Sequence, residues 1–150
     1  KFKEVDKIWK FPSGATIQFS FLDRDADVYK FQGQAYSWIG FDEITHLPTE
    51  FAWNYLASRL RTTDPEIQTY MRCTANPGGS GAHWVKKRYI EASPANESFL
   101  GKDGVIRKFI PALLEDNPYL ATTDYRKMLS SLPPVQRKQL LEGNWDINEG

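Results

Sequence analysis

One stretch of the chain, residues 36–47, constrains its fold more than any other. Five of the six residues from Tyr36 to Phe41 are apolar, aromatic or glycine, and Asp42 and Glu43 follow them directly. A continuous apolar run is typical of a parallel strand buried on both faces, and ligands bind at the carboxyl ends of such strands. We therefore expect an α/β fold in which both carboxylates lie at the end of a central strand.

Two adjacent carboxylates at a strand end suit phosphate chemistry. The first can hold Mg²⁺, often through water, and the second can orient or deprotonate an attacking water. The competing interpretation is that Asp42 and Glu43 simply begin a solvent-exposed loop.

A second strand is predicted for residues 67–75, where Asn76, Pro77 and two glycines force a turn. Thr74 and Asn76 then lie near its carboxyl end, although Asn76 and Pro77 could equally form a simple Asx turn. Apolar residues recurring every four positions predict a helix between the strands, from Pro48 to about Arg61. Basic residues at the end of this helix are expected to be surface charges that complement its dipole.

Further elements follow from local patterns. Residues 15–21 alternate as a half-buried strand in a hairpin or at a sheet edge, and residues 82–90 read as a helix with a solvated basic cluster, residues 86–88. Short strands are expected at residues 99–100 and 105–110, around a glycine-bounded turn. Helices are expected at residues 122–132 and 133–142, the second closed by Gly143.

Composition excludes several classes of protein. The chain has 150 residues with 19 basic and 19 acidic side chains, so no global positive field draws it to nucleic acid. A single cysteine, Cys73, excludes an internal disulfide and suits a reducing compartment. No apolar run approaches membrane-spanning length. Because the sequence starts at Lys1 without methionine, we expect a piece of a longer protein.

The alternating acids Asp23, Asp25 and Asp27 resemble the start of a calcium loop. Val28 and Gln34 occupy the positions where that loop needs glycine and glutamate, so a solvated loop is the preferred interpretation. A nuclease built from these acids ranks last, because no second acidic cluster has suitable spacing.

Four segments together resemble the large terminase subunit, the ATP-driven motor that packages DNA in tailed phages. They are Ile39-Gly-Phe-Asp-Glu, Cys73-Thr-Ala-Asn-Pro, Asp116-Asn-Pro-Tyr-Leu and Leu132-Pro-Pro-Val-Gln-Arg-Lys-Gln-Leu-Leu-Glu-Gly-Asn-Trp-Asp. An acid pair after an apolar strand is shared by many motors, but this combination is much more specific. The resemblance covers roughly residues 33–146.

The resemblance implies a role for each matching residue. Asp42 corresponds to the Walker B aspartate that helps to hold Mg²⁺ through water, and Glu43 to the glutamate that activates water. Thr74, Ala75 and Asn76 correspond to the coupling motif, which senses the terminal phosphate of ATP. A hydroxyl and an amide suit that role because they can change hydrogen-bond partner once the phosphate leaves.

Other family features are missing from these residues. No Walker A motif (Gly-x-x-x-x-Gly-Lys-Ser/Thr) occurs, and the only Gly-Lys pair, Gly101-Lys102, is followed by aspartate. An arginine finger is expected shortly before the Walker B strand, where the chain offers Gln32, Lys30 and Arg24, so its identity stays open. The family's nuclease acids would follow Asp146.

We therefore expect part of a P-loop NTPase-type sheet with flanking helices and a small helical appendage. Residues 1–110 would be the rear part of an ATPase core, and residues 111–150 a helical linker leading toward a nuclease domain. The full-length parent would be an ATPase using ATP and Mg²⁺, with double-stranded DNA, the portal protein and the small terminase subunit as partners. It would form a ring on the procapsid in the host cytoplasm, with no membrane contact, whereas these residues alone should be inactive.

Two alternatives remain open. One is a helicase-like P-loop motor, which would need its own DNA and arginine motifs. The other is a non-enzymatic phage or prophage module that docks to a partner. An exposed sheet edge could also pair with a second copy of the chain.

Overall fold

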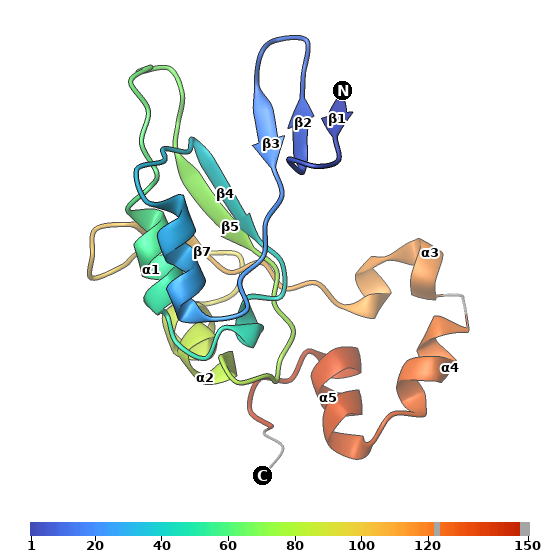
Figure 1. Cartoon of the computed structure of the whole chain (residues 1–150). Helices are drawn as coiled ribbons and strands as arrows, with labels where there is room; N and C mark the ends of the chain where they lie inside the picture. Colours follow the sequence, from blue (N-terminus) through green and yellow to red (C-terminus); the bar gives the residue numbers. More distant parts are fainter. Residues whose placement is uncertain (122–123, 148–150) are drawn as a thin grey trace.

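The computed structural model describes residues 1–121 and 124–147, which form a mixed α/β fold with small sheets (Figure 1). The strands are β1 (Phe2–Lys3), β2 (Ile8–Lys10), β3 (Thr16–Gln18), β4 (Trp38–Phe41), β5 (Tyr70–Cys73), β6 (Ser98–Leu100) and β7 (Ile106–Lys108). The helices are η1 (Asp25–Phe31), η2 (Ile44–His46), α1 (Phe51–Ala57), α2 (Ala82–Val85), η3 (Lys86–Ile90), η4 (Leu114–Asp116), α3 (Pro118–Ala121), α4 (Tyr125–Ser130) and α5 (Pro134–Glu142).

The centre of the fold is the parallel pair β4–β5, with α1 between the two strands in sequence. Trp38 pairs with Tyr70 and Phe41 with Cys73, so both strands end at the same edge. The predicted strand–helix–strand unit is therefore confirmed. Because parallel strands end together, the residues after Phe41 and after Cys73 are brought side by side.

The prediction that the first of these strands is buried on both faces was wrong. Ile39 and Phe41 pack on the core, but Trp38 is 43% exposed, as is Tyr70 on β5. Within the described residues this sheet has two strands, and one of its faces meets the core. The indole of Trp38 lies over Gly40, so closely that a Cβ added to Gly40 would be 2.6 Å from it.

The core lies between β4–β5 and helices η1, η2, α1 and α2. Val28, Ile44 and Ala52 are fully buried, and the other buried members are Leu47, Trp53, Leu56, Trp84 and Val85. Helix α1 contributes three of these residues from one face, as its apolar spacing predicts.

Helix α1 is shorter than predicted at both ends. It begins at Phe51, whose N–H is hydrogen-bonded to the Thr49 hydroxyl, and it ends at Ala57. The arginines expected in its last turn therefore lie beyond it. Arg59 stacks on the Tyr55 ring, and Arg61 donates to backbone carbonyl oxygens of the loop before β4.

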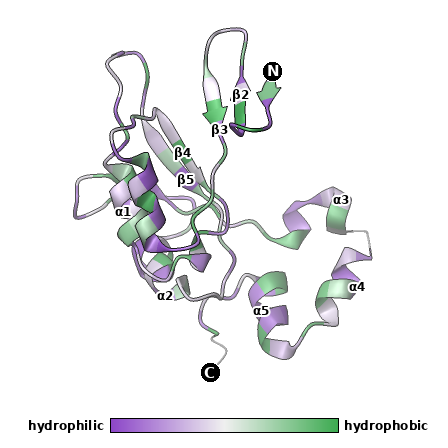
Figure 2. Ribbon diagram, in the orientation of Figure 1, coloured by the Kyte–Doolittle hydropathy of each residue, from purple (hydrophilic) through white to green (hydrophobic). Residues whose placement is uncertain are grey.

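The N-terminal hairpin is confirmed, because β2 and β3 pair antiparallel and β1 extends their sheet. Figure 1 shows this sheet apart from α1 and α2, and Figure 2 shows hydrophobic stretches in β2 and β3. The expected half-burial of residues 15–21 does not hold throughout. Phe19 and Phe21 are more than half exposed.

The predicted helix at residues 82–90 is present as α2 followed by η3, but its basic cluster is not simply solvated. Lys86 contacts the carboxylates of Asp146 and Glu91, which raises the pKa of Lys86. Arg88 contacts Glu50 and Asp103. Apart from Glu91, these partners are distant in sequence, so the run of basic residues alone could not reveal them.

The predicted hairpin around Gly101–Gly104 is confirmed by the antiparallel pair β6–β7. After it the chain is helical, as predicted, although residues 122–123, where one helix was expected to begin, lie outside the described residues. Helix α5 ends at Gly143, which adopts the left-handed conformation (φ 61°) expected of a C-terminal cap.

Candidate functional site

The acid pair lies in a tight turn where β4 passes into η2. Asp42 follows Phe41 directly, and Glu43 adopts a left-handed conformation (φ 52°, ψ 52°) that is unfavourable for a residue with a side chain. The next residue, Ile44, is fully buried and anchors the turn in the core. The turn thus holds two acidic side chains at the surface above a fixed apolar residue.

Thr74 joins this turn to the end of β5. Its hydroxyl donates a hydrogen bond to the Asp42 carboxylate and accepts one from the Glu43 backbone N–H, with 2.9 Å between nitrogen and oxygen. Its backbone N–H donates to Phe41, and its carbonyl oxygen accepts from Ile44, both at 2.9 Å. Four hydrogen bonds therefore connect the two strand ends, and the sequence-predicted neighbours Asp42, Glu43 and Thr74 do lie together.

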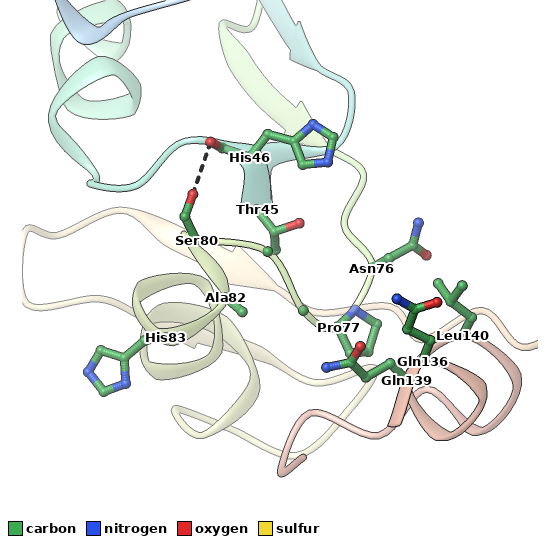
Figure 3. Close-up of a pocket in the computed structure, with 12 residues that line it drawn as sticks. Thr45, His46, Asn76, Pro77, Ser80, Ala82, His83, Gln136, Gln139 and Leu140 are labelled. Atoms are coloured by element: carbon green, nitrogen blue, oxygen red, sulfur yellow. Dashed lines mark hydrogen bonds between the residues drawn. The ribbon is translucent and has the colours of Figure 1, made fainter. Parts of the chain in front are cut away.

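The other two residues of the predicted coupling motif lie further along the same loop. Ala75 packs on the core, and Asn76 lines a cavity of about 790 Å³. Figure 3 shows this cavity between the loop after Glu43, which contributes Thr45 and His46, and helix α5. The cavity is therefore adjacent to the acid pair.

His46 was missed by sequence reasoning. Its Nδ1 lies 3.4 Å from Oε2 of Glu43, and both side chains are mostly exposed. A spacing of three residues on one helical turn brings the two together, so the pattern Glu-x-x-His was the signal available in the sequence.

The side chains at the strand ends fit a Mg²⁺ site in which the protein supplies few ligands. Asp42 is exposed, and one of its carboxylate oxygens accepts from Thr74, which leaves the other for an ion or its water shell. Sites that use one carboxylate together with waters and phosphate oxygens are typical of Mg²⁺. Among the described residues, no group of three or more histidine, cysteine or acidic side chains could hold a metal ion by itself.

The acidic residues before the central strand organise the start of helix η1. The Asp27 carboxylate accepts the backbone N–H groups of Asp23 and Arg24 at 2.8 and 3.1 Å, and these bonds lower the pKa of Asp27. Asp25 accepts the hydroxyl of Thr49. Of the three alternating acids, Asp27 therefore caps the start of η1 and Asp25 tethers it to Thr49.

Two of the three residues considered for an arginine finger, Lys30 and Gln32, make their contacts away from the acid pair. Lys30 donates to the Phe21 carbonyl oxygen, and its ammonium lies 4.7 Å from the Phe21 ring centroid. Gln32 caps the end of η1 through its backbone. The identity of an arginine finger therefore stays open.

The fold and the site define a mixed α/β protein with an acid pair and a threonine at the ends of two parallel strands. Residues 2–150 match the family model described as terminase large subunit, T4likevirus-type, N-terminal. The chain belongs to this family of large terminase subunits, which implies a role in phage DNA packaging. No curated protein and no solved structure matches the chain.

This match also corrects one expectation. It identifies the chain as the N-terminal part of a large subunit, whereas we expected the C-terminal part of the ATPase domain followed by a linker. The matched region continues through residues 111–150, so the helical tail is part of it.

In the described part of the chain, no helix is long and apolar enough to cross a membrane.

Proposed function

We propose that this chain carries the water-activating half of an ATP-hydrolysing motor that moves double-stranded DNA into a procapsid. Residues 1–110 would hold the Walker B and coupling motifs of a P-loop-type ATPase core, and residues 111–150 a helical segment toward a nuclease domain. The supporting observation is the Thr74 hydroxyl, which contacts the Asp42 carboxylate and the Glu43 backbone together.

In this proposal each residue acts through a group that the structure presents. Asp42 would help to hold Mg²⁺, which supplies charge neutralisation for the phosphates when it is bound. Glu43, held at the surface by its left-handed turn, would orient or deprotonate the attacking water. Thr74 and Asn76 would sense the terminal phosphate, because a hydroxyl and an amide can exchange a protein partner for a phosphate oxygen.

The proposed setting follows from the family. ATP and Mg²⁺ would bind in the full-length parent, where other residues would supply the phosphate-cradling loop. Double-stranded DNA, the portal protein and the small terminase subunit would be its partners, in a ring on the procapsid in the host cytoplasm.

The decisive test is the Glu43→Gln variant of the full-length subunit. Removing the charge while keeping the shape should lower ATPase turnover by about 10²-fold or more but leave ATP binding nearly unchanged. Glu66→Gln is the matched control, because Glu66 is exposed and lies in the loop that leads into β5 at the start of the strand, whereas the site lies at its end. Unchanged turnover in the Glu43 variant would refute the motor proposal and favour a docking module.

A further inference from the structure

The loop that follows Thr74 lies between two parts of the molecule that are far apart in sequence. On one side, Gly79 and Gly81 face Thr45: a Cβ on Gly79 would be 2.9 Å from the Thr45 carbonyl oxygen, and Gly81 N–H donates to that oxygen at 2.7 Å. Thr45 comes two residues after Glu43. This side of the loop therefore contacts the acid turn through backbone atoms.

The other side of the loop contacts helix α5 through Gln139. A Cβ on Gly78 would be 2.9 Å from Gln139 Oε1 and 3.2 Å from Cδ, so the amide occupies the space that a side chain at position 78 would need. Figure 3 shows Gln139 reaching from α5 toward Pro77 and the loop. A glycine on each side of the loop lets both contacts form without an intervening side chain.

Gln139 is also held by burial and by a hydrogen bond to the segment after α5. Only 5% of the residue is exposed, and its Nε2 donates to the Ile147 carbonyl oxygen at 2.8 Å. A buried amide is costly unless it is hydrogen-bonded, and here its bond holds the chain after α5. The same side chain thus lies against the loop and bonds the segment that follows α5.

We propose that Gln139 is a positioning residue that makes loop 76–81 and α5 move as one unit. The proposal rests on the motor function above: a shift of Thr74 and Asn76 when phosphate leaves would reach the helical tail through Gly78 and Gln139. Gln139 is outside the acid site, so its contribution is to the conversion of hydrolysis into DNA movement.

The first test compares Gln139→Met with Gln136→Met in the full-length subunit. Gln136 lies on the same helix and lines the same cavity, but it is only half-buried. We expect Gln139→Met to keep ATPase turnover within about twofold while raising the ATP consumed per base pair packaged by about threefold or more. A parallel fall in both activities, or an equal effect of Gln136→Met, would overturn the proposal.

The second test does not depend on hydrolysis. In nucleotide-free protein, Gln139→Met should speed amide hydrogen exchange in both segments, residues 76–81 and 134–147, whereas Gln136→Met should change neither. Faster exchange in residues 134–147 alone would show that Gln139 is merely structural and refute the link. If Gln139→Met does not fold, Gln139→Asn, which keeps the amide but shortens its reach, carries the same comparison.

These two tests separate the two proposals. An active Glu43→Gln variant would refute the motor function, and the exchange comparison would still support or refute the link between the loop and α5.

Discussion

At the scale of single residues, Thr74 has the largest role in the candidate site. Its hydroxyl donates a hydrogen bond to the Asp42 carboxylate and accepts one from the Glu43 backbone N–H. Its backbone bonds to Phe41 and Ile44, the residues on either side of the acid pair. A hydroxyl can do both because it carries one donor hydrogen and two acceptor lone pairs. The geometry of the turn therefore depends on a side chain that is 31 residues away from Glu43.

We expect Thr74→Val to lower activity much more than it lowers the stability of the fold. Valine keeps the shape but removes both hydroxyl contacts, so Glu43 should lose its fixed position. ATPase turnover of the full-length subunit should fall by about tenfold or more, while stability falls by only about 1 kcal/mol. Thr74→Ser, which keeps the hydroxyl, should retain most of the activity. Equal losses in the two variants would show that the hydroxyl is not needed.

Cys73, the residue before Thr74, should be unusually inert. Burial against the core raises its pKa to about 11, so the thiol stays protonated at pH 8. Since thiolate is the reactive form, alkylation of the native protein should be roughly 100-fold slower than that of a free cysteine. Iodoacetamide labelling followed by mass spectrometry measures this rate, with urea-unfolded protein as the control. Rapid labelling of the native chain would contradict the burial of this strand end.

At the scale of elements, a short segment after α5 attaches the helical tail to the rest of the chain, in addition to the contact of Gln139 with the loop 76–81. Trp145 packs on the core cluster and edge-on against Phe109, with ring centroids 6.5 Å apart. The next residue, Asp146, contacts Lys86 at 2.7 Å. Because an exposed ion pair adds little, the tryptophan is expected to supply most of the attachment.

Trp145→Ala should therefore loosen the tail without unfolding the core. Truncating a half-buried tryptophan should cost about 2 kcal/mol, with faster hydrogen exchange in residues 134–147 and little change in β4 and β5. Trp9→Ala, in the exposed N-terminal sheet, is the matched control and should leave residues 134–147 unchanged. Protection of the tail in the Trp145 variant would mean that other contacts hold it.

Sequence reasoning succeeded for elements whose signal is local. The apolar run before Asp42 predicted β4, the turn at Asn76 and Pro77 marked the end of the strand that contains β5, and Gly143 predicted the end of α5. It failed where the outcome depends on distant partners. Neither the pairing of Lys86 with Asp146 nor the burial of Gln139 leaves a trace in the neighbouring residues.

At the scale of the whole molecule, the 150 residues would supply one half of the proposed phosphate site. The acids and Thr74 converge, but the chain contains no glycine-rich loop with a lysine to cradle phosphates. Gly101-Lys102, the nearest sequence likeness, lies in the turn of the β6–β7 hairpin. Water activation and phosphate binding are therefore expected to depend on different stretches of the parent protein.

This division predicts weak nucleotide binding by the 150-residue chain. Without the backbone N–H groups and lysine of a phosphate loop, its Kd for Mg²⁺-ATP should be about 1 mM or weaker. Isothermal titration calorimetry measures this directly, with the full-length subunit as the positive control. Micromolar binding by the shorter chain would show that the site is complete without a Walker A loop.

The Trp38 side chain that lies over Gly40 has a consequence for how this family can vary. The two positions share one space, so a larger residue at 40 requires a smaller one at 38. Substitutions at these positions in related phages should therefore occur in pairs, with glycine retained wherever the tryptophan is present. The packing of the central strand should therefore be visible as covariation between positions 38 and 40.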